Sequence, residues 1–287
     1  MTSLKLTVPL EFTDADLPIL TSDPMLRAGS LALIEPANPI NPWPAGVPAA
    51  GYQVPNLAAK QTRALIGVAG DATFINGGFT DPASGKLERT GKGGLHGLIS
   101  QAKDATTHTS TSAGVTLSEK VWDYVAANQG HAYYASIWHR TTRGPISGKY
   151  PVQALLSSGS TTANYLYSMQ NSTRPAAADT DSFVGARGTM GDTSPALRNV
   201  GVKRVTGAMD PATATASKAR EFGWGRFRQS GSGFYSWVFY RYYLEDLTVS
   251  GRTYAEADAA DLALASKAFG AGGRYAGDTF TDPAALP

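Results

Sequence analysis

An aromatic-rich run from Gly233 to Gly251 constrains the fold of this chain more than any other segment. Large side chains, most of them apolar or aromatic, fill both alternating sets of positions along it. One set holds Trp237, Phe239, Arg241 and Tyr243, and the other holds Val238, Tyr240, Tyr242 and Leu244. A period of two with both sets filled in this way is typical of a strand that is covered on both faces. We therefore predict a buried strand of a β-sandwich.

Further short runs predict that the chain is mainly β. They are rich in β-branched and aromatic residues and are separated by clusters of Gly, Asn, Asp and Ser. They cover residues 4–12, 30–34, 63–70, 71–77, 94–103, 131–143, 152–160, 161–171, 181–188, 196–207 and 218–230. Turns rather than helices of crossover length connect most of them, which favours antiparallel pairing. Pro9 indicates an edge position for the first strand.

Two segments have helical patterns. In the first, residues 116–128, Thr116 and Glu119 form a capping-box pattern ahead of apolar residues at four-residue spacing. In the second, Thr253 and Glu256 form another such pattern, and Gly270 follows as a C-cap. The residues expected on one face of this second helix are Leu262, Ala265 and Phe269. We expect a strand and an arm over residues 1–65, a sandwich over 66–252, and a helix with an extended tail over 253–287.

A proline-rich segment from residue 36 to 59 contains no charged residue. Such a segment favours polyproline II, which advances about 3.1 Å per residue and would let it reach roughly 70 Å. A flexible linker is the alternative, but linkers are normally polar. We therefore expect an arm laid over a neighbouring subunit. Its proposed assembly residues are Pro36, Ile40, Trp43, Val47, Tyr52, Val54 and Leu57.

Composition agrees with a protein in lasting contact with partners. Charged residues make up 17% of the chain, against about 25% in typical domains, and interface cores are depleted in charge. A net charge of +2 without a basic run does not indicate nucleic-acid binding. Cysteine is absent, which excludes disulfides and thiolate metal sites. With no long apolar run or signal-peptide pattern, we expect a soluble protein that does not insert into membranes.

The residues give little indication of catalysis, so we expect no enzymatic activity, cofactor or metal. The histidines lack zinc-ligand spacing, and His139 is best explained as a packed residue of a strand. No G-x-S-x-G motif occurs. Glu245 and Asp246 are adjacent and would face opposite sides of a strand, which does not suit a glycosidase. The glycine-rich residues 91–97 are typical of a hairpin loop.

Two weaker candidates for binding remain. Calcium ligands would have to come from Asp179 with Asp181, or from Asp81 with Asp282, and solvated turns explain these residues equally well. Trp138 and Trp224 are the candidate residues for stacking on a glycan, although ordinary sandwich core is the favoured explanation for both.

The run from Tyr133 to Arg143 and the closing residues 234–283 resemble virion proteins of tailed bacteriophages that carry a concanavalin-like, or laminin-G-like, jelly-roll domain. In those proteins a strand ending in EDLTVSGRT precedes an A-E-x-x-A helix and a GGRYxxDTFTDP tail. The corresponding stretches here are residues 245–253, 255–259 and 272–283. The family supplies no catalytic residues to carry over.

The resemblance implies a homo-oligomeric virion subunit that contacts other virion proteins. Its place would be in a tail, a tail tip or a fibre base. A capsid-decorating protein and a lectin-like module that binds a host surface glycan are the alternatives, the latter by analogy of fold alone.

Overall fold

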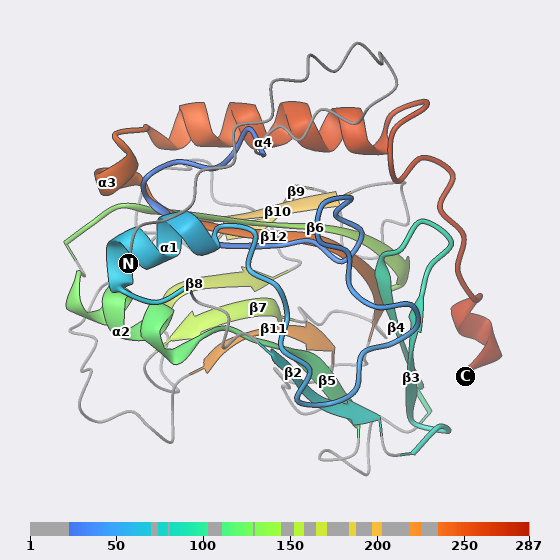
Figure 1. The fold of residues 1–287 in the computed structure, drawn as a ribbon. Helices are drawn as coiled ribbons and strands as arrows, with labels where there is room; N and C mark the ends of the chain where they lie inside the picture. The colour runs from blue at the N-terminus through green and yellow to red at the C-terminus, as the bar shows by residue number, and fades with distance from the viewer. Residues whose placement is uncertain are drawn as a thin grey trace, which may run out of the picture.

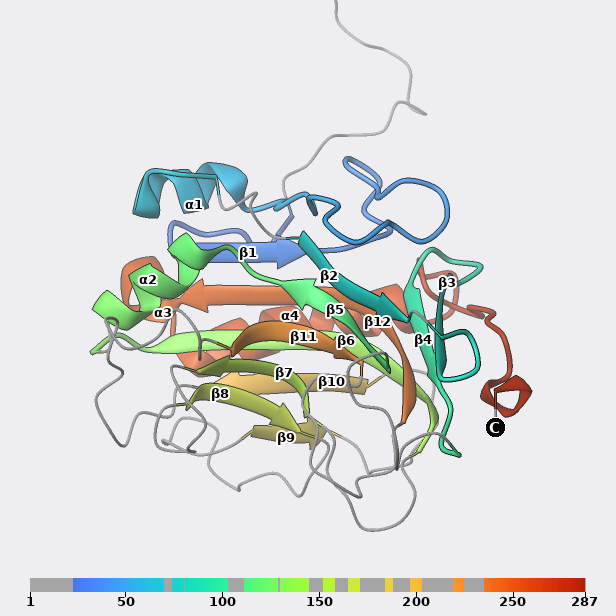
Figure 2. The same ribbon diagram turned by 90° about the horizontal axis from the view of Figure 1, so that it is seen from below.

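The computed structural model describes residues 23–69, 74–79, 81–102, 111–128, 130–144, 152–157, 165–170, 184–187, 197–202, 219–224 and 235–286. In this part of the chain one curled, mostly antiparallel β-sheet is flanked by helices (Figures 1 and 2). The mainly β fold class predicted from the sequence is therefore confirmed. The predicted strand over residues 4–12 lies outside the described residues.

The strands are β1 (Ser30–Ile34), β2 (Phe74–Phe79), β3 (Gly85–Arg89), β4 (Leu95–Ile99), β5 (Thr111–Thr116), β6 (Tyr133–Arg143), β7 (Val152–Ser157), β8 (Tyr165–Gln170), β9 (Val184–Arg187), β10 (Leu197–Val202), β11 (Ala219–Trp224) and β12 (Ser236–Asp246). The helices are α1 (Ala59–Ile66), α2 (Glu119–Ala127), α3 (Leu247–Ser250), α4 (Tyr254–Phe269) and the 3-10 turn η2 (Pro283–Ala285). The sequence patterns did not predict β3 or β5.

The strand order shows how the sheet curls. It runs β2-β5-β11-β7-β8-β9-β10-β6-β12-β4-β3, and β1 joins it by pairing with β12. Every pairing is antiparallel except that of β8 with β9, which is parallel. The two end strands, β2 and β3, contact each other, so the sheet closes back towards itself. Figure 2 shows β2, β5, β11, β7 and β8 forming one layer over β12, β6 and β10.

The concave side of the sheet encloses the largest apolar cluster. It joins Val115 and Trp224 from one layer with Ile137, Trp237 and Phe239 from the other. Burial of this aromatic and aliphatic surface is the main contribution that holds the two layers together.

Strand β12 is buried along its whole length, as predicted. Its alternation changes at a β-bulge, because Phe239 pairs with His139 whereas Arg241 pairs with the preceding residue, Trp138. Tyr240 is thus the extra residue. Beyond it, Tyr242 and Leu244 share the inner cluster with Trp237 and Phe239. The predicted grouping of Arg241 and Tyr243 with Trp237 is wrong, since a one-residue shift moves every later side chain to the other face.

The outer face of the sheet is covered by α4, which lies across β6, β12 and β10 (Figure 1). One outer cluster joins Met25, Tyr243 and Ala257, and a second joins Trp138, Val238, Tyr240, Ala265 and Tyr275. Described residues from all three predicted regions, 1–65, 66–252 and 253–287, therefore contribute to shared apolar clusters.

Helix α4 agrees closely with its sequence signals. The Thr253 hydroxyl accepts from the Glu256 amide at 3.2 Å and the Glu256 carboxylate accepts from the Thr253 amide at 2.8 Å, which confirms the capping box. Gly270 is the C-cap. Of the three residues expected on one face, Ala265 and Phe269 pack into the second outer cluster, whereas Leu262 is 43% exposed and the neighbouring Asp261 is buried.

The other helical predictions need two corrections. A helix does form within residues 116–128, but Thr116 belongs to β5, and Ser118 occupies the N-cap position of α2 without a side-chain cap bond. Residues 63–70, predicted as a strand, instead contain the end of α1. There Gly67 adopts a left-handed conformation with φ of 76° and donates to the Arg63 carbonyl, which is a helix-ending arrangement.

Candidate functional site

The proline-rich segment folds against its own chain. The Trp43 amide donates to the Pro36 carbonyl at 3.0 Å, and the Tyr52 amide donates to the Ala49 carbonyl at 3.1 Å, so the segment forms compact loops. The predicted extended polyproline II arm is therefore wrong over this stretch.

The seven proposed assembly residues divide into three groups. Pro36, Trp43 and Val54 are buried, and the latter two belong to the inner apolar cluster of the chain itself. Tyr52 and Leu57 are half-buried. Ile40 and Val47 are 55% and 40% exposed. Burial thus removes Trp43 and Val54 from contact with any neighbour, and the open part of the segment is the loop that carries Ile40 and Val47.

Asn56 fixes the C-terminal end of this segment. Its side-chain oxygen accepts from the Leu33 and Ala58 amides, both at 3.0 Å. Its side-chain nitrogen donates to the Leu31 carbonyl at 3.2 Å and to the Thr62 hydroxyl at 3.1 Å. These bonds use the backbone groups along the edge of β1 that β12 does not pair, so the edge is covered.

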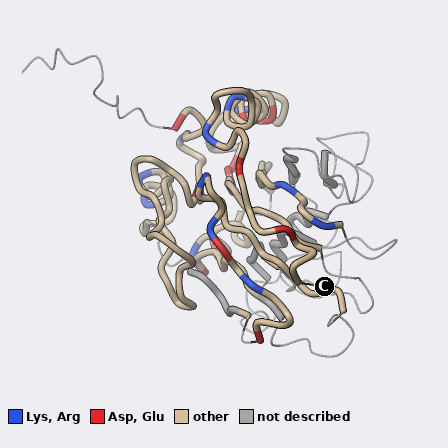
Figure 3. The backbone as a smooth tube through the Cα atoms, turned by 90° about the vertical axis from the view of Figure 1, so that its right-hand side faces the viewer, with Lys and Arg blue, Asp and Glu red and all other residues tan. Residues whose placement is uncertain are grey.

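The N-terminal end is held against the β3–β4 hairpin. Arg89 donates to the Pro36 carbonyl at 3.2 Å, and its guanidinium lies 6.0 Å from the Trp43 ring centre. The Trp43 ring lies 6.5 Å from Phe239 of β12. The loop between these two anchors contains no charge, whereas Figure 3 shows basic and acidic positions interspersed over the rest of the described chain.

A cluster of buried charges lies beneath α4. Arg241 is 3% exposed and donates to both Asp23 carboxylate oxygens, at 2.7 and 2.8 Å. It also contacts Glu35 at 3.4 Å, and Glu35 accepts further bonds from Arg274 and, at 2.8 Å, from Tyr275. The cluster joins the N-terminal part of the described chain, the aromatic strand and the tail after α4.

The charges of this cluster stabilise one another. Burial of Arg241 opposes its charged form, but the hydrogen bond and charge of Asp23 outweigh burial and raise the arginine pKa above its ordinary value. Burial likewise acts to raise the Asp23 pKa, and Arg241 outweighs it, so that this pKa is lowered.

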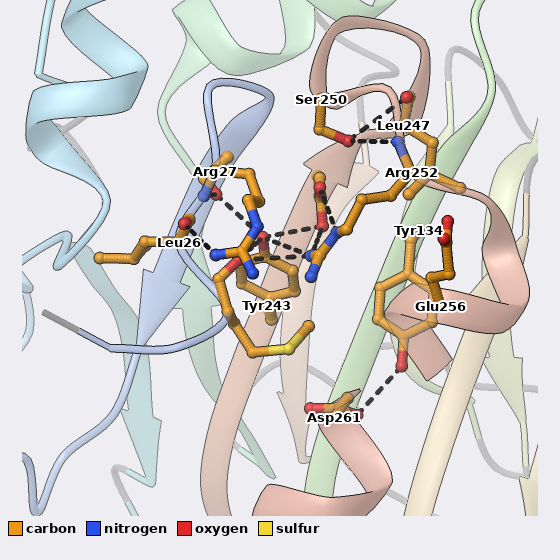
Figure 4. Close-up of polar contacts among 12 residues, drawn as sticks. Leu26, Arg27, Tyr134, Tyr243, Leu247, Ser250, Arg252, Glu256 and Asp261 are labelled. Carbon is orange, nitrogen blue, oxygen red and sulfur yellow. Dashed lines mark hydrogen bonds and ion pairs between the residues drawn. The ribbon is translucent and has the colours of Figure 1, made fainter. Parts of the chain in front are cut away.

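A second polar network surrounds Tyr243 (Figure 4). The Tyr243 hydroxyl lies 2.9 Å from Ser30 and 2.9 Å from the Glu245 carboxylate, and 2.8 Å from the Met25 carbonyl. Arg252 pairs with the same carboxylate, with one bond at 3.0 Å. Asp246, in contrast, accepts from the Val249 amide at 3.1 Å and the Tyr124 hydroxyl at 2.8 Å. The two adjacent carboxylates therefore serve different structural contacts.

Three of the four histidines are described. His96 lies between Glu88 at 2.9 Å and Thr142 at 2.8 Å, and His131 lies 2.6 Å from Asp246. His139 is buried, as expected, with its ring perpendicular to Trp237 at 6.1 Å. Within the described residues no three His, Asp or Glu side chains gather as metal ligands would.

Glu88 links the hairpin to the C-terminal tail, because it accepts from the Thr281 amide at 2.7 Å and from the Thr281 hydroxyl at 2.6 Å. Burial acts to raise the Glu88 pKa, but the bonds from Thr281 and His96 outweigh it and lower the pKa to about 2. Burial lowers the His96 pKa despite the nearby carboxylate.

The candidate calcium ligands make turn contacts. Asp81 accepts from the Ala83 amide at 3.0 Å, and Asp282 accepts from the Ala284 amide at 2.9 Å. Both therefore adopt the local turn geometry that an Asp-Pro sequence favours. Asp179 and Asp181 lie outside the described residues.

The two candidate glycan-stacking residues are not on the surface. Trp224 is 1% exposed, and its indole N–H donates to the Trp237 carbonyl at 2.9 Å inside the sheet. Trp138 is 2% exposed and donates to Asp261 at 3.0 Å beneath α4. Neither offers an open ring face for stacking on a sugar, and the core interpretation agrees with their burial.

Among the described helices, none combines the length and the apolar character needed to span a membrane. No protein-family model matches the chain, and neither the curated proteins nor the solved structures compared with it include a match.

Proposed function

We propose that this chain is a non-catalytic structural subunit of a bacteriophage virion, located in a tail, a tail tip or a fibre base. In this proposal the curled sheet is a concanavalin-like jelly roll, and copies of the subunit associate with one another through the loop that carries Ile40 and Val47. The resemblance of residues 133–143 and 234–283 to phage virion proteins supports the assignment.

One observation supports the assembly role more than any other: the uncharged loop is held at both ends while two aliphatic side chains remain open to solvent. The Arg89 bond to the Pro36 carbonyl holds it on one side and the bonds of Asn56 hold it on the other. A loop held in this way loses little conformational entropy when it binds, which favours association. The absence of charge lowers the cost of desolvating it.

The oligomeric state of the full chain tests this role. We expect a homo-oligomer in analytical ultracentrifugation, and we expect the double variant Ile40→Asp/Val47→Asp to be monomeric with an unchanged circular dichroism spectrum. Leu262→Asp is the matched control, because Leu262 is 43% exposed but lies on α4, and it should remain oligomeric. A monomeric wild-type chain, or a double variant that associates normally, contradicts the assembly role.

The virion assignment has its own test. An antibody against the purified chain should label phage particles from the source of the gene at regular positions under the electron microscope. Particles without label, but with the chain recovered free in the lysate, contradict it.

A further inference from the structure

A cavity of ≈ 390 Å³ opens between the outer face of the sheet, the C-terminal half of α4 and the turn that follows. Asp23 and Glu35 line it from the N-terminal side, Trp138 and Arg241 from the sheet, and Lys267 and Arg274 from α4 and the turn. Its volume falls within the range of about 300–1,000 Å³ that is usual for small-molecule sites.

The lining carries a surplus of positive charge. Three of the named side chains are cationic and two are carboxylates. The carboxylates are already engaged, because Asp23 accepts two bonds from Arg241 and Glu35 accepts bonds from Arg274 and Tyr275. Lys267, in contrast, is exposed and has no ion-pair partner within the described residues.

The hydrogen-bond donors of the lining are also less fully used than its acceptors. The Nε atom of Arg241 is buried and has no hydrogen-bond partner in the described part of the chain. The Arg274 side chain remains 40% exposed, although one terminal nitrogen binds Glu35. Lys267 and the remaining nitrogens of Arg274 therefore offer uncommitted donors to the cavity, whereas its two carboxylates are used. Trp138 and Leu264 add an apolar wall.

We propose that this cavity binds a ligand carrying a single carboxylate on a compact body, with Lys267 and Arg274 contacting the carboxylate. A planar guanidinium fits a carboxylate well. One negative charge balances the one unpaired cation, whereas a phosphate dianion would bring a second charge close to Asp23 and Glu35. The carboxylate belongs either to a uronic acid of a glycan or to a free organic acid. The proposal does not depend on the virion assignment.

Calorimetric titration of the full chain tests the proposal with three probes: glucuronate, glucose and lactate. We expect saturable binding of glucuronate or lactate, with a dissociation constant on the order of 1 mM or below, and no binding of glucose. Tighter binding of glucuronate than of lactate assigns the site to an acidic glycan, and the reverse order assigns it to a free organic acid. Absence of binding by both carboxylates, or equal binding of glucose, overturns the proposal.

A substitution of Lys267 tests whether the carboxylate binds in this cavity. Lys267→Gln should weaken carboxylate binding about tenfold, because it removes one charge-assisted hydrogen bond. Its fold should be unaffected, since no described residue pairs with Lys267. Lys60→Gln, an exposed change on α1, is the matched control and should bind as the wild type does. In NMR spectra the Trp138 indole N–H resonance should move on binding in the wild type. Unchanged affinity in Lys267→Gln overturns the assignment of this cavity.

Discussion

Arg241 donates two hydrogen bonds to the Asp23 carboxylate, at 2.7 and 2.8 Å, although 218 positions separate the two residues in sequence. The bulge at Tyr240 makes this contact possible, because it places Arg241 on the outer face of β12. One ion pair thereby fixes the N-terminal part of the described chain to its central strand, and it also lines the cavity beneath α4.

Replacement of Arg241 by Met should destabilise the protein by about 3–5 kcal/mol, because Asp23 and Glu35 would lose the cation that compensates their burial. Urea unfolding at neutral pH measures this loss. Arg63→Met is the control, since Arg63 is exposed on α1, and it should change stability by less than about 0.5 kcal/mol. A similar small effect in both variants would show that Arg241 is not the structural cation described here.

The link between Glu88 and Thr281 should make stability depend on pH. The Glu88 pKa is lowered from 4.5 to about 2 in the fold, so its contribution is complete above pH 4.5 and is lost as the pH falls towards 2. Wild type should therefore exceed Glu88→Gln in free energy of unfolding at pH 6, and the difference should shrink across this window. Urea unfolding at a series of pH values measures it. A difference that stays constant with pH contradicts the proposed role of the ionised carboxylate.

Patterns that depend on neighbours in sequence predicted much of the fold. The capping box of Thr253 and Glu256 and the following Gly270 gave both ends of α4, because these contacts are local. The burial of β12 followed from its aromatic composition. The bulge at Tyr240 depends on the register of β12 with β6, so the alternation pattern alone predicts the wrong face for Arg241 and the residues beyond it.

The candidate sites were harder to predict than the fold, because they depend on contacts between residues far apart in sequence. The proline-rich pattern predicts that Trp43 packs on a neighbouring subunit, yet Phe239 and Arg89, far away in sequence, contact it within its own chain. No local pattern around Asp23, Glu35 or Arg274 indicates an ion pair with Arg241. Their convergence around Arg241 follows from the packing of three segments that no spacing rule relates. The one available hint was a charged residue within an otherwise aromatic strand.

Asn56→Ala should cost about 2–4 kcal/mol of stability, because it leaves the buried Leu33 and Ala58 amides without their side-chain acceptor. Thermal unfolding followed by circular dichroism gives the change. Asn41→Ala, at an exposed position of the same proline-rich segment, should melt as the wild type does. Equal melting temperatures for both variants would be inconsistent with an anchoring role for Asn56.

Substitutions of Trp43 and Ile40 distinguish the two proposed roles of the proline-rich segment, which are folding of its own chain and assembly with other copies. Trp43→Ala should destabilise the isolated chain by about 3–5 kcal/mol, because the ring packs into the inner cluster of its own subunit. Ile40→Ala should change stability by less than about 0.5 kcal/mol, since this side chain is 55% exposed. Urea unfolding at a protein concentration too low for association measures both. If the segment were instead an arm that binds only a neighbour, the two substitutions would have equally small effects under these conditions. A large loss for Trp43→Ala alone therefore assigns the tryptophan to folding and leaves the exposed aliphatic residues for assembly.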